Sequence, residues 1–349
     1  MVYTGLMDVT RACVFVGLCV LCGSSFADQA TASGKRLAAD NGSENKPLAA
    51  MREPEAEMAS YWLDRIGGAS RQLNYIGTFS YQTGWRSETS RIAHRYFNGE
   101  ESERMEVLDG SPREVIRRGK ELRCVLPAQR AVIIGQVGNR GSFPGRVPQS
   151  RTGLTDNYRI RLEGVERIAE HEVQKLVFEP RDELRFAHAL WADRQSGLLL
   201  KSQVLDAGGN VIEQFSFIDV RIGGEVQDGM LAPRVEVDAD WQTIDVRGDD
   251  ETQIGNPWGL RQSLPGFVLT TMLRHRSGGT LQMVFSDGLA ALSVFIEPAE
   301  AGVEARGAYP GGGAVNVFER IASGHRITVL GEVPALLVQR AAEAVEALK

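Results

Sequence analysis

The architecture of this chain follows from residues 157–222, which read NYRIRLEGVERIAEHEVQKLVFEPRDELRFAHALWADRQSGLLLKSQVLDAGGNVIEQFSFIDVRI. Apolar runs of strand length alternate there with short turn-forming groups such as Arg194-Gln195-Ser196-Gly197 and Ala207-Gly208-Gly209-Asn210. Turns of this length join neighbouring strands, so the stretch predicts an antiparallel meander. The expected strands are Tyr158–Val165, Glu172–Glu179, Leu184–Ala192, Leu198–Asp206 and Val211–Ile222.

The last of these strands is predicted to carry apolar side chains on both faces. Strict alternation along a strand places Phe215 and Phe217 on one face. The same alternation places these residues on the other face: Ile212, Ile218, Val220 and Ile222. A sheet that is apolar on both sides needs a covering layer on each side. Because the chain offers few helices, we expect one face to form an apolar groove.

The charge of the chain gives no general reason to expect a nucleic-acid partner. Its 349 residues are 43% hydrophobic and 24% charged, which is enough for a sizeable core and favours two domains. The formal net charge is −6, so there is no overall attraction to a polyanion. Charge is unevenly distributed, because residues 113–161 carry net +8 and residues 219–251 carry net −7. The basic segment is therefore expected to attract anions.

Residues 1–27 are typical of a secretory signal peptide. Arg11 precedes the apolar run 12–21, and Ser25-Phe26-Ala27 supplies small residues at the positions that a signal peptidase reads. The run is too short to span a bilayer. We expect this segment to be cleaved and the mature chain to be exported. Three of the four cysteines lie in this segment, and Cys124, the fourth, is expected to be a buried apolar residue.

Residues 28–53 are predicted to be a flexible tether, and residues 54–225 a large β domain. A helix is expected from Pro54 to Leu73, with one apolar face that covers the sheet. Strands are expected at Asn74–Gln82, Trp85–Phe97, Arg104–Leu108, Arg113–Arg118, Glu121–Leu126 and Ala131–Ile134, in addition to the meander. Residues 135–156 show no regular period, and such long connections often form functional flaps, so we predict a lid there.

The C-terminal part is predicted to be a small antiparallel β domain with a terminal helix. Residues 226–256 read as a linker, with room for one or two strands in Pro233–Val246, and residues 257–349 form the domain. Strands are expected at Phe267–Arg274, Leu281–Ser286, Leu289–Glu297, Ala314–Ile321 and His325–Leu330, with a flexible loop tip at Gly311–Gly313. Pro334 begins the closing helix, whose apolar stripe is Leu337, Ala341, Val345 and Leu348.

The sequence contains no recognisable catalytic constellation. Its five histidines are scattered, and no two have the spacing of a zinc-binding helix. It lacks a Gly-x-Ser-x-Gly elbow, a Walker loop and a dinucleotide fingerprint. We therefore predict a binding protein rather than an enzyme, without cofactor or metal, and keep a hydrolase as a minor alternative.

Two sets of residues are candidates for binding. The aromatic set is predicted to line the groove, with core packing as the alternative for most of its members: Phe79, Tyr81, Trp85, Tyr96, Phe186, Trp191, Phe215 and Phe217. The basic set is predicted to bind phosphate or acidic side chains: Arg113, Arg117, Arg118, Arg123, Arg159 and Arg161.

The order of several short strings resembles the MucB/RseB family of periplasmic regulators of the envelope-stress sigma factor. These strings are Leu73-Asn74-Tyr75, Leu108-Asp109-Gly110 with Arg113-Glu114-Val115 and Arg118-Gly119, Glu213-Gln214-Phe215, Leu264-Pro265-Gly266-Phe267, Ser286-Asp287-Gly288-Leu289 and Gly331-Glu332-Val333-Pro334. Together they cover nearly all of the expected mature chain. Their order and spacing carry the resemblance, since no single string is specific.

The resemblance implies a β-rich α+β fold, in which a LolA/LolB-like half-open antiparallel β-barrel with a covering helix precedes the small domain. It also implies a partner, the periplasmic domain of a MucA/RseA-like anti-sigma factor, which the protein shields from site-1 proteolysis. Binding of lipid or lipopolysaccharide in the groove would release that partner. The alternative function is a periplasmic lipid or lipoprotein carrier. The sequence leaves room for a homo-oligomer. Residues 135–156 are poorer in aromatic residues than the family leads us to expect, so no lipid contacts are assigned there.

Overall fold

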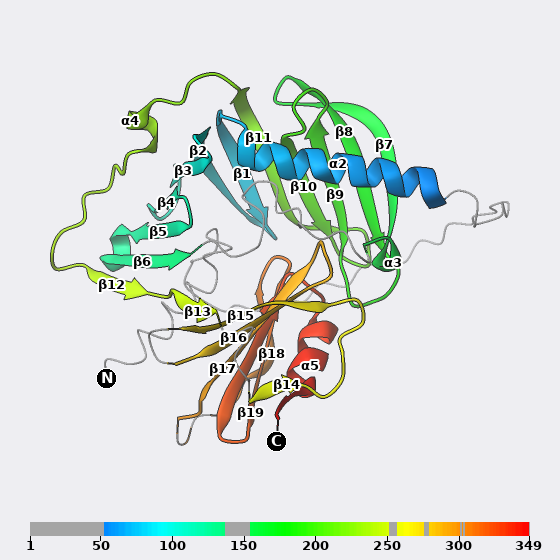
Figure 1. Ribbon diagram of the computed structural model, residues 1–349, viewed down its shortest axis with the longest axis vertical. Helices are drawn as coiled ribbons and strands as arrows, with labels where there is room; N and C mark the ends of the chain where they lie inside the picture. The colour runs from blue at the N-terminus through cyan, green and yellow to red at the C-terminus, as the bar shows by residue number, and fades with distance from the viewer. Residues whose placement is uncertain are drawn as a thin grey trace.

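The computed structural model describes residues 52–136, 154–250, 257–275, 279–300, 302 and 304–348. The predicted signal peptide, nearly all of the tether and most of the predicted lid lie outside these residues. Two β-sheets dominate the described part, and helices are few (Figure 1). Among the described helices, none combines the length and the apolar character that a membrane-spanning helix requires.

The larger sheet contains twelve strands in the order β12-β6-β5-β4-β3-β2-β1-β11-β10-β9-β8-β7. Their bounds are β1 Tyr75–Thr83, β2 Arg86–Phe97, β3 Glu100–Val107, β4 Glu114–Arg118, β5 Glu121–Leu126, β6 Ala131–Gln136, β7 Tyr158–Ile168, β8 His171–Pro180, β9 Ala187–Asp193, β10 Leu199–Leu205, β11 Val211–Ile222 and β12 Gln242–Asp245. A 3-10 turn, η2 Pro127–Gln129, precedes β6.

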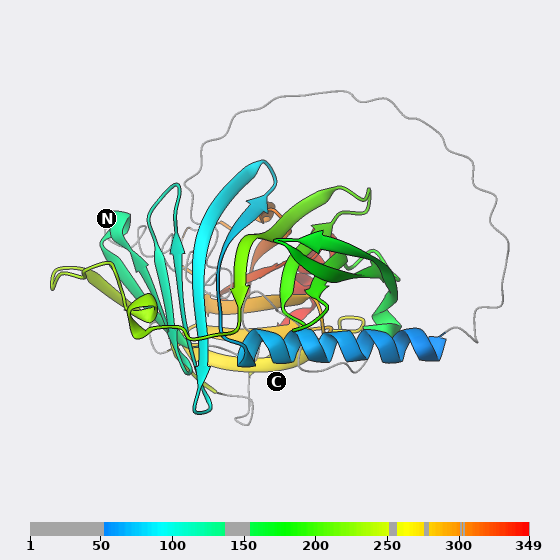
Figure 2. The same ribbon diagram turned by 90° about the horizontal axis from the view of Figure 1, so that it is seen from above.

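This sheet confirms the predicted meander and is open. The strands follow an arc when seen from above (Figure 2), and β12 and β7 form its two edges. Every pair is antiparallel except β12 with β6, which is parallel. The predicted linker therefore contributes a strand to the large sheet, because its residues 242–245 lie alongside Ala131–Ile134.

The prediction that β11 is apolar on both faces is wrong. The register between β1 and β11 shifts at Thr78/Phe79, where Phe79 faces Phe217 and Thr78 faces Asp219. One extra residue, Ile218, bulges from β11, and a bulge of this kind reverses the alternation beyond it. Val220 consequently returns to the buried face that carries Phe217, whereas Ile218 is 58% exposed.

Helix α2 (Arg52–Gln72) lies across β7 to β11 and covers the sheet, as predicted (Figure 1). Trp62, Leu63 and Ile66 are buried from the helix side, and they form one core with Phe178 and Leu190 of the sheet. Two further short helices are α3 (Leu154–Asn157), which precedes β7, and α4 (Asp228–Leu231), which packs near β2 and β3.

The smaller sheet has seven strands in the order β13-β15-β16-β17-β20-β19-β18. Their bounds are β13 Gly248–Asp250, β15 Val268–His275, β16 Leu281–Ser286, β17 Ala291–Pro298, β18 Gly307–Gly312, β19 Val315–Ala322 and β20 His325–Gly331. Strand β18 was not predicted, and it takes in part of the expected flexible loop tip. Helix α5 (Ala335–Ala344) packs on this sheet through Leu337, Val338 and Ala341.

The predicted closing helix is too long by one turn. It ends at Ala344, and Val345–Ala347 form strand β21, which pairs with β14 (Trp258–Leu260). The backbone of Val345 is extended, with φ −66° and ψ 127°. Pairing with β14 supplies hydrogen bonds that the last helical turn would otherwise have made internally. Val345 is still buried, but Leu348 is 51% exposed.

Candidate functional site

Five residues of the predicted aromatic set belong to one buried core of the large domain. Phe79, Tyr81, Trp191, Phe215 and Phe217 are each no more than 6% exposed. The rings of Phe79 and Phe215 lie 5.1 Å apart, as do those of Phe215 and Phe217. These phenylalanine rings pack against one another. The amino groups of Lys175 and Lys201 lie over the Trp191 ring, 5.2 and 4.5 Å from its centroid.

The other three residues of the aromatic set lie apart from this core. Trp85 sits in the turn between β1 and β2, is 87% exposed and stacks with Arg86 at 5.1 Å. Tyr96, near the end of β2, is 37% exposed. Phe186 precedes β9 and is partly buried.

Two of the predicted anion-binding arginines are largely buried and already have carboxylate partners. Arg113 is buried and paired with Glu88, whose pKa is raised by burial against the lowering effect of Arg113. Arg117 Nη1 lies 2.7 Å from Glu101 Oε2, and its side chain is 11% exposed. An external anion would have to compete with these carboxylates.

The remaining arginines do not form one patch. Arg118 and Arg123 are exposed on β4 and β5, whereas Arg159 and Arg161 lie on β7, the edge strand at the far end of the sheet. Arg161 Nη2 also binds Glu179 Oε1 at 2.5 Å. Arg118 and Arg123 are therefore the exposed members of the set on the paired strands β4 and β5.

A buried polar cluster lies beneath the C-terminal end of α2. His94 Nδ1 donates a hydrogen bond to the carbonyl of Leu73 (2.8 Å), and its ring stacks on Tyr75 with a centroid separation of 4.8 Å. Its Nε2 lies 3.6 Å from Glu101 Oε2, which is an ion-pair distance if His94 is protonated. Both His94 and Tyr75 are fully buried.

Glu103 is a buried carboxylate of this cluster. It pairs across strands with His94 on one side and Arg117 on the other. Burial raises its pKa, while the charges of His94 and Arg117 act to lower it. Within the described residues, Glu103 Oε2 and His94 Nε2 have no hydrogen-bond partner. No group of three or more His, Cys, Asp and Glu side chains that could hold a metal ion occurs in the same residues.

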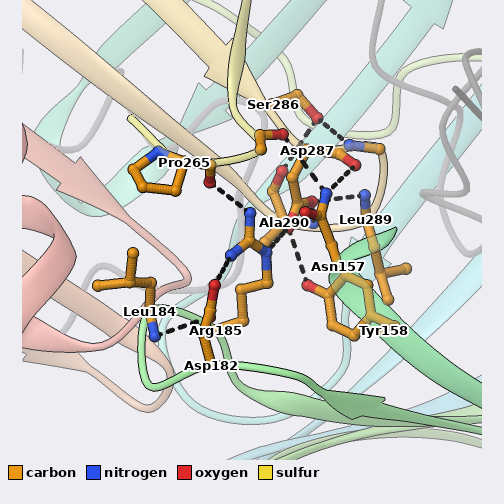
Figure 3. Close-up of polar contacts among 12 residues, drawn as sticks. Asn157, Tyr158, Asp182, Leu184, Arg185, Pro265, Ser286, Asp287, Leu289 and Ala290 are labelled. Atoms are coloured by element: carbon orange, nitrogen blue, oxygen red, sulfur yellow. Dashed lines mark hydrogen bonds and ion pairs between the residues drawn. The ribbon is translucent and has the colours of Figure 1, made fainter. Parts of the chain in front are cut away.

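A second buried cluster joins the two domains around Arg185 (Figure 3). Arg185 lies in the connection between β8 and β9 and its side chain is fully buried. Its Nε donates to Asp287 Oδ2 at 2.6 Å and its Nη2 to the carbonyl of Pro265 at 2.6 Å, both in the small domain. Tyr158 OH donates to the same carboxylate oxygen at 3.1 Å. Burial and the nearby Asp287 raise the pKa of Tyr158.

Asp287 is satisfied on both of its oxygens. Its Oδ1 accepts hydrogen bonds from the backbone N–H groups of Leu289 (2.9 Å) and Ala290 (2.8 Å). The guanidinium of Arg185 lies over the Phe267 ring at 4.8 Å. The pair therefore has the additional hydrogen bonds that a buried ion pair needs if it is not to be a net cost.

Apolar side chains cross this joint in both directions. Leu184 of the large domain belongs to the buried core of the small domain, and Leu289 of the small domain packs against the core beneath α2. Gly266 permits the close approach, because it has φ +73° and a Cβ there would lie 2.3 Å from Arg185 Nη2.

The roles of the joint residues were missed in the sequence, although the strings that contain them were singled out. Leu264-Pro265-Gly266-Phe267 and Ser286-Asp287-Gly288-Leu289 supply nearly all of the small-domain side of this contact. An apolar string with a central glycine and an Asp-Gly turn indicate tight backbone geometry, but they do not indicate the partner across the joint.

Comparison with family models assigns both domains. The model of the MucB/RseB N-terminal domain matches residues 58–235, and that of the MucB/RseB C-terminal domain matches residues 252–346. The chain is 32% identical over 304 residues to the sigma factor AlgU regulatory protein MucB of Pseudomonas aeruginosa, covering 84% of this chain and 93% of the relative. It is 24% identical over 293 residues to the sigma-E factor regulatory protein RseB of Escherichia coli, covering 80% and 88%.

Solved structures give the same result. The crystal structure of MucB in complex with MucA(peri) has a TM-score of 0.62 to this chain at 28% identity, covering 83% of this chain and 99% of that one. The complex structure of Pseudomonas aeruginosa MucA/MucB gives 0.64 at 29%, covering 84% and 99%. The fold, both domain matches and the relatives agree: this chain belongs to the MucB/RseB family.

Proposed function

We propose that this protein is a periplasmic regulator that binds the periplasmic part of a membrane-anchored anti-sigma factor of the MucA/RseA type. Bound in this way, the anti-sigma factor is shielded from the site-1 protease, and the envelope-stress sigma factor stays repressed. Binding of lipid or lipopolysaccharide by the large domain releases the partner. The chain acts by binding, without a catalytic step.

The observation that carries this proposal is the similarity of this chain to MucB in its crystal structure in complex with MucA(peri), which extends over 83% of this chain and both of its domains. The exposed Arg118 and Arg123 offer a basic surface for acidic side chains or phosphate on the large domain. Their charges are screened by salt, so this contribution should weaken as ionic strength rises.

Protease protection tests the first half of the proposal. The purified protein is mixed with the periplasmic domain of the MucA/RseA-type anti-sigma factor from the same source, and cleavage by the site-1 protease is followed over time. Slower cleavage in proportion to complex formation is expected. Unchanged cleavage at saturating protein would reject shielding. Recovery of lipoproteins but no anti-sigma factor in a pull-down would favour the lipoprotein-carrier alternative.

The lipid half of the proposal places an acyl chain against the aromatic core of Phe79, Phe215 and Phe217. Because these rings are in mutual contact, a chain can enter only if they separate, so lipid binding and a rearranged core are one event. That rearrangement gives the lipid a means to change the partner surface, which is the differential interaction that a switch requires.

Lipid release is tested by adding lipopolysaccharide to the preformed complex and measuring the fraction of partner that remains bound. Release is expected for the unaltered protein, with a weaker response in the double variant Arg118→Glu/Arg123→Glu at low salt. Arg159→Glu/Arg161→Glu, at the far edge of the sheet, makes the same change of charge, is the matched control and should respond normally. A complex that lipopolysaccharide leaves intact would reject the release mechanism.

A further inference from the structure

The two domains are attached to each other at three separate places in the described residues. Domains within one chain commonly move relative to each other unless their interface is large and apolar. Here the small domain meets the large one at the Arg185 joint, at the chain crossing between the sheets and at the tip of the β18–β19 hairpin. Each place restrains a different part of the small domain.

The Arg185 joint is the strongest of the three. A rotation there would expose Asp287, which is fully buried, and break its bonds to Arg185 and Tyr158. It would also withdraw Leu184 from the core of the small domain and Leu289 from the core beneath α2. Polar and apolar contacts would therefore be lost together.

The chain crossing leaves little free backbone between the sheets. Strand β12 ends at Asp245 in the large sheet and β13 begins at Gly248 in the small one. Between them, Val246 N–H donates to the carbonyl of Ile134 (2.8 Å), and the carbonyl of Val246 accepts from His275 Nδ1 (2.9 Å). One residue is thus bonded to both sheets at once.

The hairpin tip closes against the end of β1. Ala314 N–H lies 3.4 Å from Glu213 Oε2, and Tyr81 OH donates to the other oxygen of that carboxylate. Gly313 has φ +55°, and a Cβ there would lie 2.4 Å from Thr83 Cγ2. Packing of this closeness leaves no room for the tip to slide along β1.

We infer that the two domains form a single rigid body, so that the partner and the lipid affect each other without domain rotation. Only the statement about the partner and the lipid rests on the proposed function. Release of the partner then comes from competition or from local change in the large domain. The arrangement assigns Arg185 the part of a positioning residue, which holds the small domain in the orientation that the partner meets.

Unfolding of the free protein tests the rigid body without any partner. Differential scanning calorimetry of the unaltered chain should show one transition, because the domains share core residues across the joint. Asp287→Ala should split it into two. Asp287→Asn, which keeps the oxygen that accepts from Leu289 and Ala290, should shift the single transition to a lower temperature. Two transitions in the unaltered chain, or one unshifted transition in Asp287→Ala, would overturn the inference.

A disulfide clamp tests whether rotation accompanies binding. In Thr83→Cys/Gly313→Cys, oxidation ties the hairpin tip to β1, and the controls are the reduced form of the same double variant and Thr83→Cys alone, because a side chain at Gly313 would meet Thr83 Cγ2 if Thr83 were kept. The affinity for the anti-sigma factor and its release by lipopolysaccharide should agree within about twofold between the oxidised and reduced forms. A loss of about tenfold or more on oxidation, reversed by reductant, would overturn the rigid body. Failure of the unaltered protein to bind would instead reject the proposed function, and the calorimetric result would still decide the inference.

Discussion

The two buried charge clusters of this protein are built in opposite ways. At the domain joint, Asp287 has partners on both oxygens, and Arg185 binds Asp287, Asp182 and the carbonyl of Pro265. Beneath α2, Glu103 Oε2 and His94 Nε2 lack hydrogen-bond partners among the described residues. A satisfied cluster holds two surfaces together, whereas an incompletely satisfied one favours the neutral form of its acids. The first therefore serves the shape of the molecule, and the second makes the stability of the large domain depend on pH.

The largest expected effect comes from breaking the satisfied cluster on one side. Arg185→Met removes the guanidinium but leaves the Asp287 carboxylate buried, so it should lower the free energy of unfolding by about 3–5 kcal/mol. Adding Asp287→Asn should restore a large part of the loss, because the only carboxylate then left without Arg185 is Asp182, whose side chain is 36% exposed to solvent. Urea denaturation measures both. If the double variant is no more stable than Arg185→Met, the charge of Asp287 does not decide the stability of the joint.

An intermediate effect separates two neighbouring arginines. Arg117→Ala removes the partner of Glu101 and a cation close to buried Glu103, and should lower the free energy of unfolding by about 2 kcal/mol. Arg118→Ala, one residue away but exposed, should change it by less than about 0.5 kcal/mol. Thermal unfolding at matched pH compares them. Equal effects would mean that Arg117 is not part of a structural network.

The smallest effect has the opposite sign and depends on pH. Burial raises the pKa of Glu103 in the folded state, so the folded protein holds a proton that the unfolded chain releases near the ordinary carboxyl range. The contribution of Glu103 to the free energy of unfolding is fully present below that range and is lost as pH rises through the folded-state pKa of Glu103. Glu103→Gln should remove this decline and be more stable than the unaltered protein at neutral pH, because no buried charge then has to form.

The comparison at low pH serves as the control for Glu103→Gln. Below the unfolded-state pKa both forms carry a neutral side chain at this position, so their denaturation midpoints should converge. A gap that persists unchanged from acidic to neutral pH would show that Glu103 does not titrate differently in the folded and unfolded states.

Much of the fold was predictable because its signals are local. Turn groups and alternation located the strands of the meander, and apolar spacing located α2. Alternation also identified Cys124 as a buried residue, and it is 3% exposed. The β-bulge at Ile218 was not predictable in this way, because it is set by how β11 pairs with β1, a strand more than a hundred residues earlier.

The candidate site was predicted less well than the fold. Alternation placed Phe215 and Phe217 on one face of their strand, but exposure depends on what lies over a face, and so the exposed Trp85 and Tyr96 were grouped with them. The arginines were grouped by their proximity in the sequence, whereas the sheet order sends Arg159 to the opposite edge from Arg118. Arg185 and Asp287 are 102 residues apart in the sequence, so no local sequence pattern could predict that they pair.

The direct passage from β12 to β13 has a practical consequence for preparing fragments of this protein. The match to the N-terminal family model ends at residue 235, and the match to the C-terminal model begins at residue 252. Neither match includes β12 or β13. A fragment cut at those limits would leave the backbone of β6 and of β15 unpaired at a sheet edge, and exposed edges invite association with other chains. Expression limits placed after Asp245 for the first piece and before Gly248 for the second would keep each sheet complete.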